Sequence, residues 1–539
     1  MERKTVRDPI HGFIEFPSDL FETLIDTEIF QRLREIRQLG LSHYVYPGAN
    51  HTRFEHSLGV AHVVKNMLNN IRKNTEEMVI RYLRFKDLKE YAGEVLDHLD
   101  SMKKEIIVAA LLHDLGHVAL SHVFEVAMKD YIYYIEAKEK SVQTMVSHEH
   151  LTLSLLNEMK ERLGPIKYAG EEVKLELVEE ILKLAYIDKE VDCANDSELN
   201  AKVIASQMIS SEIDADRGDY ILRDYYFSGA TAGLYDLDRL YNVIAIVPKR
   251  VAQKVFTLGV VEKGISVIEN MLLSRVYMYN DVYLHPISII YSAMATRVLS
   301  LILALPDEDL RTLANGYPEF SQIRKIMLHD IPELYESVLN VTDGAFYRIL
   351  RRIVSFGKEL KEGSEISLER PDLFLALYTL AKGILSRRHW SALIMNEYNS
   401  RSIVRAIKED RDRFMYVMKR NLNPFVIFYH SAYEGLSGEV YVFDRSKPHE
   451  AVPIQHSPRS VVSRNLKGSL YAKVTIVFPK TMGRIDNLSA WRLKEGKAEG
   501  LFEDTFMDKK EVEELLRESF EKALSLAWEL QEWSSGRVD

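Results

Sequence analysis

The stretch from Ile106 to Leu112, IIVAALL, is apolar on every side. A helix without a polar face has to lie among other helices, because any exposed side would leave apolar surface in water. The chain has only 25 Gly and 15 Pro among 539 residues, which favours long helices. The sequence therefore predicts a mainly α fold with this segment in its core.

Hydrophobic periodicity predicts further elements on both sides of this segment. Helices are expected at 26–38, 54–71, 76–104, 207–223 and 264–283, with a Pro-Gly loop at 44–53. Alternating β-branched and aromatic residues predict strands at 438–443 and 471–478, and Asp508 caps a predicted amphipathic helix at 509–533. We therefore expect an all-helical body followed, from residue 430 onward, by a smaller α+β segment.

Composition and charge bear on the partners and the cellular compartment to be expected for this chain. Its 70 basic and 80 acidic residues give a net charge of −10, which weighs against broad nucleic-acid binding. Cys193 is the single cysteine, so no disulfide forms within the chain and a reducing cytoplasm is the expected compartment. The first residues lack the apolar core of a signal peptide, and Arg297 interrupts the most apolar stretch, 287–306, so we expect no membrane span.

The apolar helix runs into His113-Asp114, and His117 and His122 follow. An ionisable pair at the end of a dry helix is costly unless something compensates it. A divalent cation does so, because neutral imidazole and carboxylate are both good metal ligands. His117 lies one turn after His113, and Gly116 between them lets another backbone approach closely.

A bare His-Asp pair is weak evidence, because chance gives roughly one in a chain of this composition. The pair at 329–330 has no neighbouring histidine, and we expect it at the surface. The longer string from 113 to 122 is harder to dismiss, but one His and one Asp do not close a metal site. Two other segments offer ligands: Arg53-Phe54-Glu55-His56-Ser57 and the acidic stretch 212–220 around Asp216.

Together these segments resemble the HD-domain phosphohydrolases, a family of metal-dependent enzymes named for its His-Asp motif. The resemblance is strongest to the deoxynucleoside-triphosphate triphosphohydrolase branch, which includes an enzyme with an additional sterile-alpha-motif domain. It implies an HD catalytic domain at 1–310, a helical extension at 311–430 and an α+β segment at 431–539, with no sterile-alpha-motif domain in front. The segments that carry it are Asp8-Pro-Ile-His-Gly, Ile25-Asp-Thr, Phe30-Gln-Arg-Leu-Arg, Gln38-Leu-Gly, Phe54-Glu-His-Ser-Leu-Gly, the 113–122 string, Ile213-Asp-x-Asp and Asp219-Tyr220.

The resemblance implies roles for the central residues. One divalent cation (magnesium, manganese, iron, nickel or zinc) would polarise phosphate and help generate a hydroxide nucleophile. His122 would protonate the departing 5′ oxygen, Glu125 would orient His122, and His117 and His148 would contact phosphate. The products would be a deoxynucleoside and triphosphate. The cation would be held by four residues: His56, His113, Asp114 and Asp216.

The resemblance also implies how a dNTP substrate would bind. Arg53, Arg217 and Arg275 would clamp the polyphosphate, because guanidinium forks suit phosphate oxygens. Gln38, Tyr220 and Asp224 would contact the sugar, with Tyr220 packed where a 2′-hydroxyl would sit, and Tyr283 would lie near the base. Leu284 stands where a relative carries glutamine, so the base contacts are expected to differ. Arg217 stands where relatives carry lysine, a change that preserves the charge and alters the geometry.

Several relatives are activated by guanine nucleotide bound at subunit contacts. Asp26, Gln31 and Arg34 occupy the matching positions here, although a charged helix face explains the same three residues. The resemblance thus implies activation by GTP or dGTP and assembly into a homo-oligomer, a dimer or tetramer.

Other functions stay open. An HD phosphohydrolase can act instead on a nucleotide monophosphate, an alarmone or a cyclic dinucleotide. Asn315-Gly316-Tyr317-Pro318 resembles the end of a cyclic-dinucleotide signature but lies too far from Asp114 to belong to it. A nucleotide-sensing or nucleic-acid-binding protein with a vestigial centre is the third hypothesis, and the presence of all four expected ligands argues against it.

Overall fold

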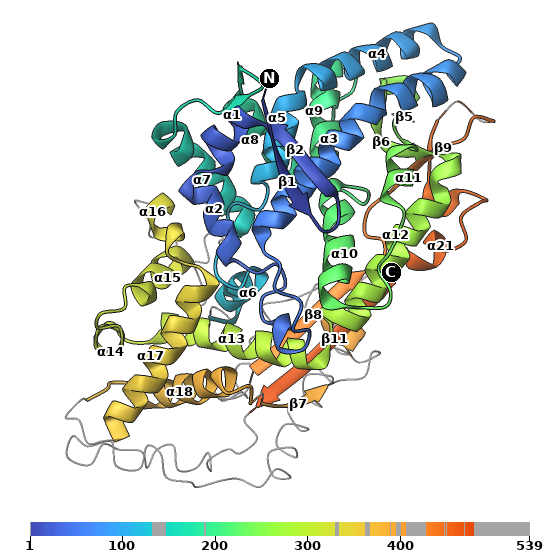
Figure 1. The fold of residues 1–539 in the computed structure, drawn as a ribbon. Coiled ribbons are helices and arrows are strands. Elements are labelled where there is room, and N and C mark those ends of the chain that lie inside the picture. The colour runs from blue at the N-terminus through green and yellow to red at the C-terminus, as the bar shows by residue number, and fades with distance from the viewer. Residues whose placement is uncertain are drawn as a thin grey trace, which may run out of the picture.

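The computed structural model describes residues 2–131, 147–187, 190–328, 334–361, 367–388, 390–394, 400–405 and 427–478, except 447, 449 and 468 (Figure 1). The expected helix at 509–533 and the His-Asp pair at 329–330 lie outside these residues. Helices dominate what is described, which confirms the mainly α fold class. The division into 1–310, 311–430 and 431–539 stays a prediction.

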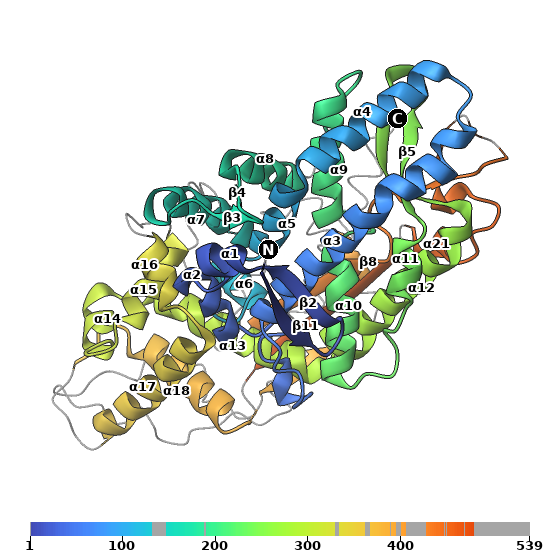
Figure 2. The ribbon, with the colours of Figure 1, turned by 45° about the horizontal axis from the view of Figure 1, so that its top comes forward.

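The apolar run forms α5 (Lys103–Leu112), which is buried from Glu105 to its end. It packs against α3 (Arg53–Met78), α8 (Leu175–Tyr186) and α9 (Ser197–Ile209). On its other side α3 packs against α10 (Ala215–Ser228), and both views show α3 beside α9 and α10 (Figures 1 and 2). The predicted helical core is thus present, with α5 and α3 at its centre.

Gly59 sets how closely α3 and α10 approach. A Cβ at this position would lie 1.9 Å from Asp219 Oδ1 and 2.7 Å from a guanidinium nitrogen of Arg223. Only glycine fits there, because real side chains do not come so close to a neighbour. The α3 start, where a Thr52–Glu55 capping box fixes the first turn, is therefore held against the first turns of α10.

Two expected helices are shorter than predicted. The 26–38 segment forms α2 (Glu28–Gln31) and a 3-10 turn (Arg32–Glu35), and the chain then becomes extended at Ile36. The 207–223 segment is broken, because α9 ends at Ile209 and Asp214 starts a new helix by accepting a hydrogen bond from Arg217 N–H. This break turns the acidic residues after 210 toward the centre of the fold.

The body is not all helical, contrary to our expectation. β1 (Arg3–Asp8) and β2 (Gly12–Pro17) form an antiparallel hairpin, and β5 (Ile244–Arg250) pairs antiparallel with β6 (Val255–Val261). β5 and β6 are mostly buried on both faces, so their sequences are apolar without a period of two. Periodicity therefore could not distinguish them from buried helix.

Residues from the C-terminal segment complete the sheets of the body. β9 (Tyr441–Phe443), shorter than the strand predicted at 438–443, pairs parallel with β6, and β10 (Val452–Pro453) follows β9. A second sheet has the order β7 (Ser391–Ile394), β11 (Leu470–Phe478), β8 (Ile427–Glu434), which confirms the strand predicted at 471–478.

The most apolar stretch forms α13 (Pro286–Ala304). Among the described residues it is the one helix long and apolar enough to cross a membrane, with a mean hydropathy of 1.8, despite Arg297. However, 83% of it is buried inside the fold, as in the core helix of a folded domain. Arg297 is paired there, because its guanidinium donates to both carboxylate oxygens of Asp130 at 2.8 and 3.1 Å.

The remaining elements surround this framework. The π-helical turn Tyr279–Tyr283 continues α12 (Ile265–Met278). Together the turn and the helix match the helix expected at 264–283. The 76–104 segment contains the end of α3, all of α4 and the start of α5. The other bounds are α1 (Ser18–Leu20), α4 (Lys86–Ser101), α6 (His122–Asp130), α7 (His148–Arg162), β3 (Lys167–Tyr168), β4 (Glu171–Glu172), α11 (Leu237–Tyr241), α12 (Ile265–Met278), α14 (Asp307–Leu313), α15 (Glu319–Leu328), α16 (Leu334–Leu339), α17 (Asp343–Lys361), α18 (Pro371–Leu385) and α21 (Ser463–Leu466).

Candidate metal-centred active site

The four predicted metal ligands meet at the ends of three helices. His56 comes from α3, His113 and Asp114 follow α5, and Asp216 lies in the first turn of α10. His56 Nε2 lies 3.0 Å from Asp216 Oδ1 and 3.4 Å from Asp114 Oδ2. His113 Nε2 lies 3.5 Å from Asp114 Oδ1 and 3.9 Å from Asp216 Oδ1. The fold thus brings together two imidazoles and two carboxylates from distant parts of the sequence.

The hydrogen bonds of the two histidines show that this set fits a divalent cation. His113 Nδ1 lies 2.8 Å from the Ala110 carbonyl oxygen and His56 Nδ1 lies 2.8 Å from Asp219 Oδ2, so each Nδ1 carries the proton and donates it. Both Nε2 atoms are buried and have no hydrogen-bond partner among the described residues. These two Nε2 atoms and the carboxylates of Asp114 and Asp216 would hold a cation, which would supply the partner that both Nε2 atoms lack.

The electrostatics at this point favour positive charge. Burial alone would lower the pKa of His56, but the neighbouring carboxylates of Asp216 and Asp219 outweigh it and raise the pKa to about 10. Burial would raise the pKa of Asp114, yet the Arg53 guanidinium and nearby histidines hold it well below its usual range. A dication held by these carboxylates would supply this positive charge and displace the second proton of His56, which would leave its imidazole as a neutral ligand.

A second group of titratable residues lies beside the first and contains the four predicted catalytic residues. His148 Nδ1 lies 2.6 Å from Glu125 Oε1, and His122 Nδ1 lies 3.5 Å from Glu125 Oε2. The rings of His117 and His148 stack 4.0 Å apart, and His117 Nε2 is 3.4 Å from Asp114 Oδ1. Glu125 therefore lies between two histidines, and His117 connects this group to the metal-ligand group.

Glu125 and His148 each shift the pKa of the other toward its charged form. Burial would raise the pKa of Glu125, but hydrogen bonds from His122 and His148 hold it far below its usual range. Burial would likewise lower the pKa of His148, and Glu125 outweighs this and raises it. A protonated His148 keeps its Nε2–H as a donor for an anionic ligand.

A cavity of about 510 Å³ opens beside both groups. Its lining includes His122 and His148 together with three of the four predicted metal ligands, His113, Asp114 and Asp216. All the residues assigned to the substrate by resemblance line it as well: Gln38, Arg53, Arg217, Tyr220, Asp224, Arg275 and Tyr283.

The three arginines are only partly neutralised. Arg53 contacts Asp114 and donates from Nε to Ser121 Oγ at 3.1 Å, and Arg217 donates to Asp214 Oδ2 at 2.7 Å. Arg275 reaches Glu212 Oε2 at 3.4 Å. The Nε atoms of Arg217 and Arg275 are buried without a hydrogen-bond partner among the described residues, so neither guanidinium group has all of its donors satisfied.

Part of the cavity wall is aromatic. Asp224 Oδ2 accepts a hydrogen bond from the Tyr283 hydroxyl at 2.5 Å, and Asp224 Oδ1 lies 2.7 Å from His51 Nε2. The rings of Tyr220 and Tyr283 meet edge to face at 6.4 Å. This arrangement combines apolar ring faces with one fixed carboxylate, as in sites that bind a sugar and a base.

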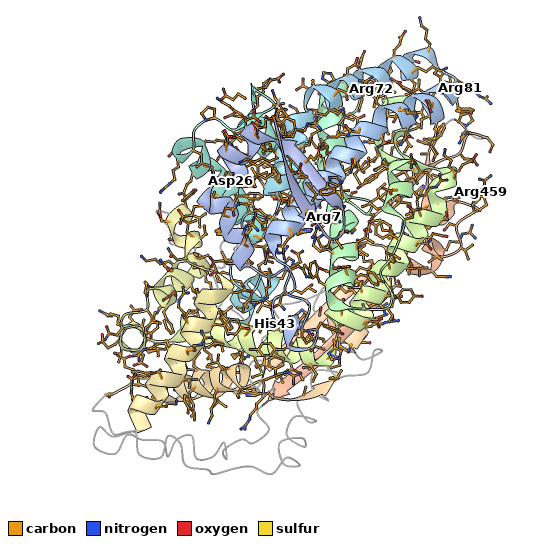
Figure 3. The ribbon with its side chains drawn as sticks, in the orientation of Figure 1. Arg7, Asp26, His43, Arg72, Arg81 and Arg459 are labelled. Carbon is orange, nitrogen blue, oxygen red and sulfur yellow. The ribbon has the colours of Figure 1, made fainter. Side chains whose placement is uncertain are left out.

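The three residues predicted to bind an activating nucleotide do not line this cavity. Asp26, labelled in Figure 3, accepts a hydrogen bond from Lys4 Nζ at 3.0 Å. Gln31 Oε1 accepts one from Arg34 Nε at 2.8 Å, and the Arg34 guanidinium lies 3.5 Å from the centre of the Phe54 ring. They therefore lie outside the cavity lining, and Asp26 is joined to β1 through Lys4.

Several residues at the site had no assigned role in the sequence analysis. Asp219 accepts a hydrogen bond from His56 Nδ1, and His51 Nε2 lies within hydrogen-bond distance of Asp224. The Tyr186 hydroxyl donates to the His113 carbonyl at 2.8 Å. Ser431 of β8 lines the cavity. Asp219 could have been found from its place one helical turn after Asp216. Nothing in the sequence around Ser431 indicated that β8 reaches the cavity.

Comparisons with known proteins agree with this geometry. The HD domain family matches residues 53–215, and the HD associated region matches residues 236–317. The chain is 30% identical over 340 residues to the uncharacterised protein YwfO of Bacillus subtilis, covering 63% of this chain and 65% of that protein. It is 25% identical over 359 residues to the deoxynucleoside triphosphate triphosphohydrolase SAMHD1 homologue of Dictyostelium discoideum, covering 65% of this chain and 60% of that protein. The matches thus span less than two thirds of either relative.

A solved structure shares the fold. The crystal structure of a phosphohydrolase from Bacteroides thetaiotaomicron superposes with a TM-score of 0.59, and the match covers 88% of this chain and all of that one at 23% identity. HD domains are metal-dependent, and the described residues contain the His and Asp cluster that such a domain needs. The chain therefore contains an HD domain at residues 53–215, followed by an HD-associated region at residues 236–317.

Proposed function

We propose that this protein hydrolyses dNTPs to a deoxynucleoside and triphosphate. One observation carries the proposal: seven residues assigned to the substrate by resemblance, from sequence positions 38 to 283, line a single cavity that three of the four predicted metal ligands also line. A relative whose name states this activity matches 65% of the chain.

The chemistry follows from the positions of the side chains. A cation bound by His56, His113, Asp114 and Asp216 would polarise a phosphoryl oxygen and acidify a water molecule. Arg217 and Arg275, which line the cavity, would bind the polyphosphate through their guanidinium groups. The oxygen of water attacks the α-phosphorus, the bond from phosphorus to the 5′ oxygen breaks, and the proton of the water passes to solvent. His122 gives its proton to the 5′ oxygen and is then reprotonated from solvent.

A product assay tests this function. The metal-loaded protein is incubated with each dNTP and each matching NTP, and the products are separated by ion exchange. Deoxynucleoside plus triphosphate is the expected result, with NTPs cleaved more slowly because Tyr220 packs against the sugar. The variant His113→Ala is expected to lose activity, whereas His98→Ala on α4, outside the cavity, retains it. Monophosphate plus pyrophosphate, or no cleavage, would refute the proposal.

We further propose that guanine nucleotide activates the protein and promotes assembly into a tetramer. Supporting this, Asp26 and Arg34 are exposed at a surface separate from the cavity, with Gln31 between them. GTP would replace the contacts of Lys4 with Asp26 and of Arg34 with Gln31. Light scattering and dNTP turnover with and without GTP test both points, and the pair Asp26→Ala and Arg34→Ala should abolish the response. Unchanged mass and rate in GTP would exclude activation.

A further inference from the structure

The loop before His122 has an unusual backbone. Leu120 and Ser121 both have positive φ, 64° and 54°, a region that residues with a side chain rarely adopt. Two such residues in succession persist only where the surrounding structure holds them. His122, the first residue of α6, follows directly, and its side chain lines the cavity. The direction of His122 therefore depends on whatever holds this loop.

Asp343 holds it. This buried residue, the first of α17, lies outside both regions matched by the family comparisons. Its Oδ1 accepts a hydrogen bond from Leu120 N–H at 2.8 Å. Two residues before it in the chain, the carbonyl of Val341 accepts a bond from Ala119 N–H at 3.0 Å. The start of α17 thus binds two successive amides of the strained loop.

The same carboxylate also binds Arg37, the residue before Gln38 in the cavity lining. Asp343 Oδ2 accepts hydrogen bonds from the backbone N–H and from the guanidinium of Arg37, each at 3.2 Å. The Ser121 hydroxyl donates to the Arg37 carbonyl at 2.9 Å, which closes the connection between the two loops. Gln38, which lines the cavity, follows Arg37 directly. One buried side chain therefore fixes the spacing between the His122 loop and the Gln38 loop.

The opposite end of α6 is fixed as well. Asp130, its last residue, accepts the Arg297 guanidinium and the Ser300 hydroxyl of α13. With both ends of the helix held, a shift of the loop at Leu120 changes the direction of His122 rather than the position of the whole helix. The strained loop is the adjustable part of this arrangement.

We propose that Asp343 is a positioning residue for His122: its carboxylate stabilises the left-handed conformation of Leu120 and Ser121 and so directs His122 toward the leaving oxygen. This inference rests on the proposed function, in which His122 is the acid. Asp343 acts through the backbone and does not line the cavity.

The test compares Asp343→Asn with a matched control, Asp309→Asn. Asp309 is equally buried and also accepts two backbone N–H groups, from Glu369 and Arg370 at 2.8 and 2.9 Å, but lies outside the cavity lining. We expect Asp343→Asn to lower kcat about 100-fold, because small misplacements of a catalytic group have effects of this size. We expect Asp309→Asn to lower only the melting temperature.

A double-mutant cycle separates positioning from general damage. In a His122→Ala background, Asp343→Asn should lower kcat no further, because there is no acid left to misplace. In the Asp343→Asn background, Leu120→Gly should restore part of kcat, because glycine adopts positive φ without a clamp. Additive losses, or equal kcat losses from Asp343→Asn and Asp309→Asn, would overturn the inference. If Asp343→Asn does not fold, Asp343→Glu, which moves the carboxylate by one methylene, replaces it in the same cycle.

Crystal structures of the variants distinguish a failure of this inference from a failure of the proposed function. If the wild-type protein cleaves no dNTP, the proposed function fails. Crystal structures of Asp343→Asn and Asp309→Asn then still report on the loop. Leu120 and Ser121 leaving the left-handed region in Asp343→Asn alone supports the inference, and an unchanged loop overturns it.

Discussion

At the scale of single residues, Asp219 is the carboxylate on which the metal site depends. It accepts hydrogen bonds from His56 Nδ1 at 2.8 Å and from two nitrogens of Arg223 at 2.8 Å, and His11 Nε2 lies 2.7 Å from it. Arg223 also donates to Asp8 at 2.8 Å. Asp219 therefore fixes the tautomer of His56 and ties it to the N-terminal hairpin.

We expect Asp219→Asn to weaken divalent metal binding about 10- to 100-fold, the usual effect of removing a carboxylate behind a ligating histidine. The amide can no longer accept from all of its present donors, so His56 loses its fixed orientation. Titration against a chromophoric chelator measures the affinity, with Asp309→Asn as the control for a lost buried carboxylate. Equal affinities in wild type and Asp219→Asn would show that His56 needs no such support.

The pair formed by Glu125 and His148 predicts a pH dependence of stability. The lowered pKa of Glu125 contributes stability above its ordinary pKa, and the raised pKa of His148 contributes below the ordinary pKa of histidine. The contribution is therefore complete between about pH 4.5 and 6.5 and declines as pH rises through the pKa of His148. The melting temperature of Glu125→Gln should fall furthest below wild type in that window.

The control for this pH prediction is Glu161→Gln, an exposed residue near the end of the same helix, α7, as His148. Thermal melts from pH 5 to 9 should give a flat difference for Glu161→Gln and a difference that narrows at high pH for Glu125→Gln. A constant difference for Glu125→Gln would mean that this pair is not charged in the folded protein.

The four residues predicted to bind the metal and the seven assigned to the substrate were named from sequence motifs and from the family resemblance, and the fold brings them close together. Their supporting partners were not predicted. Asp219 reaches His56 only because Gly59 lets α3 and α10 approach, and Asp343 reaches Leu120 from more than 200 residues away. Such partners depend on how helices pack, and a single sequence does not contain that information. The roles of the predicted residues stay predictions until the assays are done.

At the scale of elements, Gly116 controls how α7 meets the end of α5. A Cβ there would lie 2.1 Å from the His148 carbonyl oxygen and 2.5 Å from Thr152 N, which confirms the close approach expected from the sequence. Gly116 N–H also donates to Thr152 Oγ1 at 2.9 Å. This crossing places His148 beside His117.

Gly116→Ala should therefore destabilise the fold by about 1–3 kcal/mol, the usual effect of overpacking, and lower turnover by displacing His148. Gly93→Ala in α4 is the control, because a Cβ there meets nothing within 4 Å and alanine is the better helix former. Urea unfolding should show the first variant less stable and the second equally or more stable than wild type. If both behave alike, the crossing tolerates a wider separation.

Element boundaries were harder to predict than element types. The 207–223 segment has no Pro and only Gly218, so nothing in its periodicity indicates the break at which Asp214 begins α10. β5 and β6 were missed because buried strands and buried helices are both continuously apolar. Both errors concern segments whose conformation is decided by tertiary packing.

At the scale of the whole molecule, the C-terminal segment contacts side chains that line the cavity. Tyr433 of β8 stacks on Tyr279 at 3.9 Å, and the Arg275 guanidinium lies 4.4 Å from the centre of the Tyr433 ring. Glu212, which pairs with Arg275, accepts hydrogen bonds from Ser437 Oγ at 2.6 Å and from Gly438 N–H at 2.8 Å. Arg275 is thus held by residues beyond both regions matched by family comparison.

We expect Tyr433→Leu to raise KM for dNTPs about fivefold with a small change in kcat, because a cation–π contact contributes about 1 kcal/mol to holding Arg275. Tyr433→Phe keeps the ring and loses only the hydroxyl bond to the Gly435 carbonyl, so its KM should stay near that of wild type. Steady-state kinetics on both variants provide the comparison. A matching rise in KM for Tyr433→Phe would assign the effect to the hydroxyl instead.

The parallel pairing of β6 with β9 has a consequence for synthesis on the ribosome. β6 ends at Val261, and its partner begins at Tyr441. At about 5–20 residues per second, the intervening chain takes roughly ten seconds or longer to emerge. Throughout that interval one edge of β6 has free amide and carbonyl groups, which are competent to pair with another nascent chain. Pulse-labelled intermediates that stop before β9 should accordingly depend on chaperones more than the finished protein does.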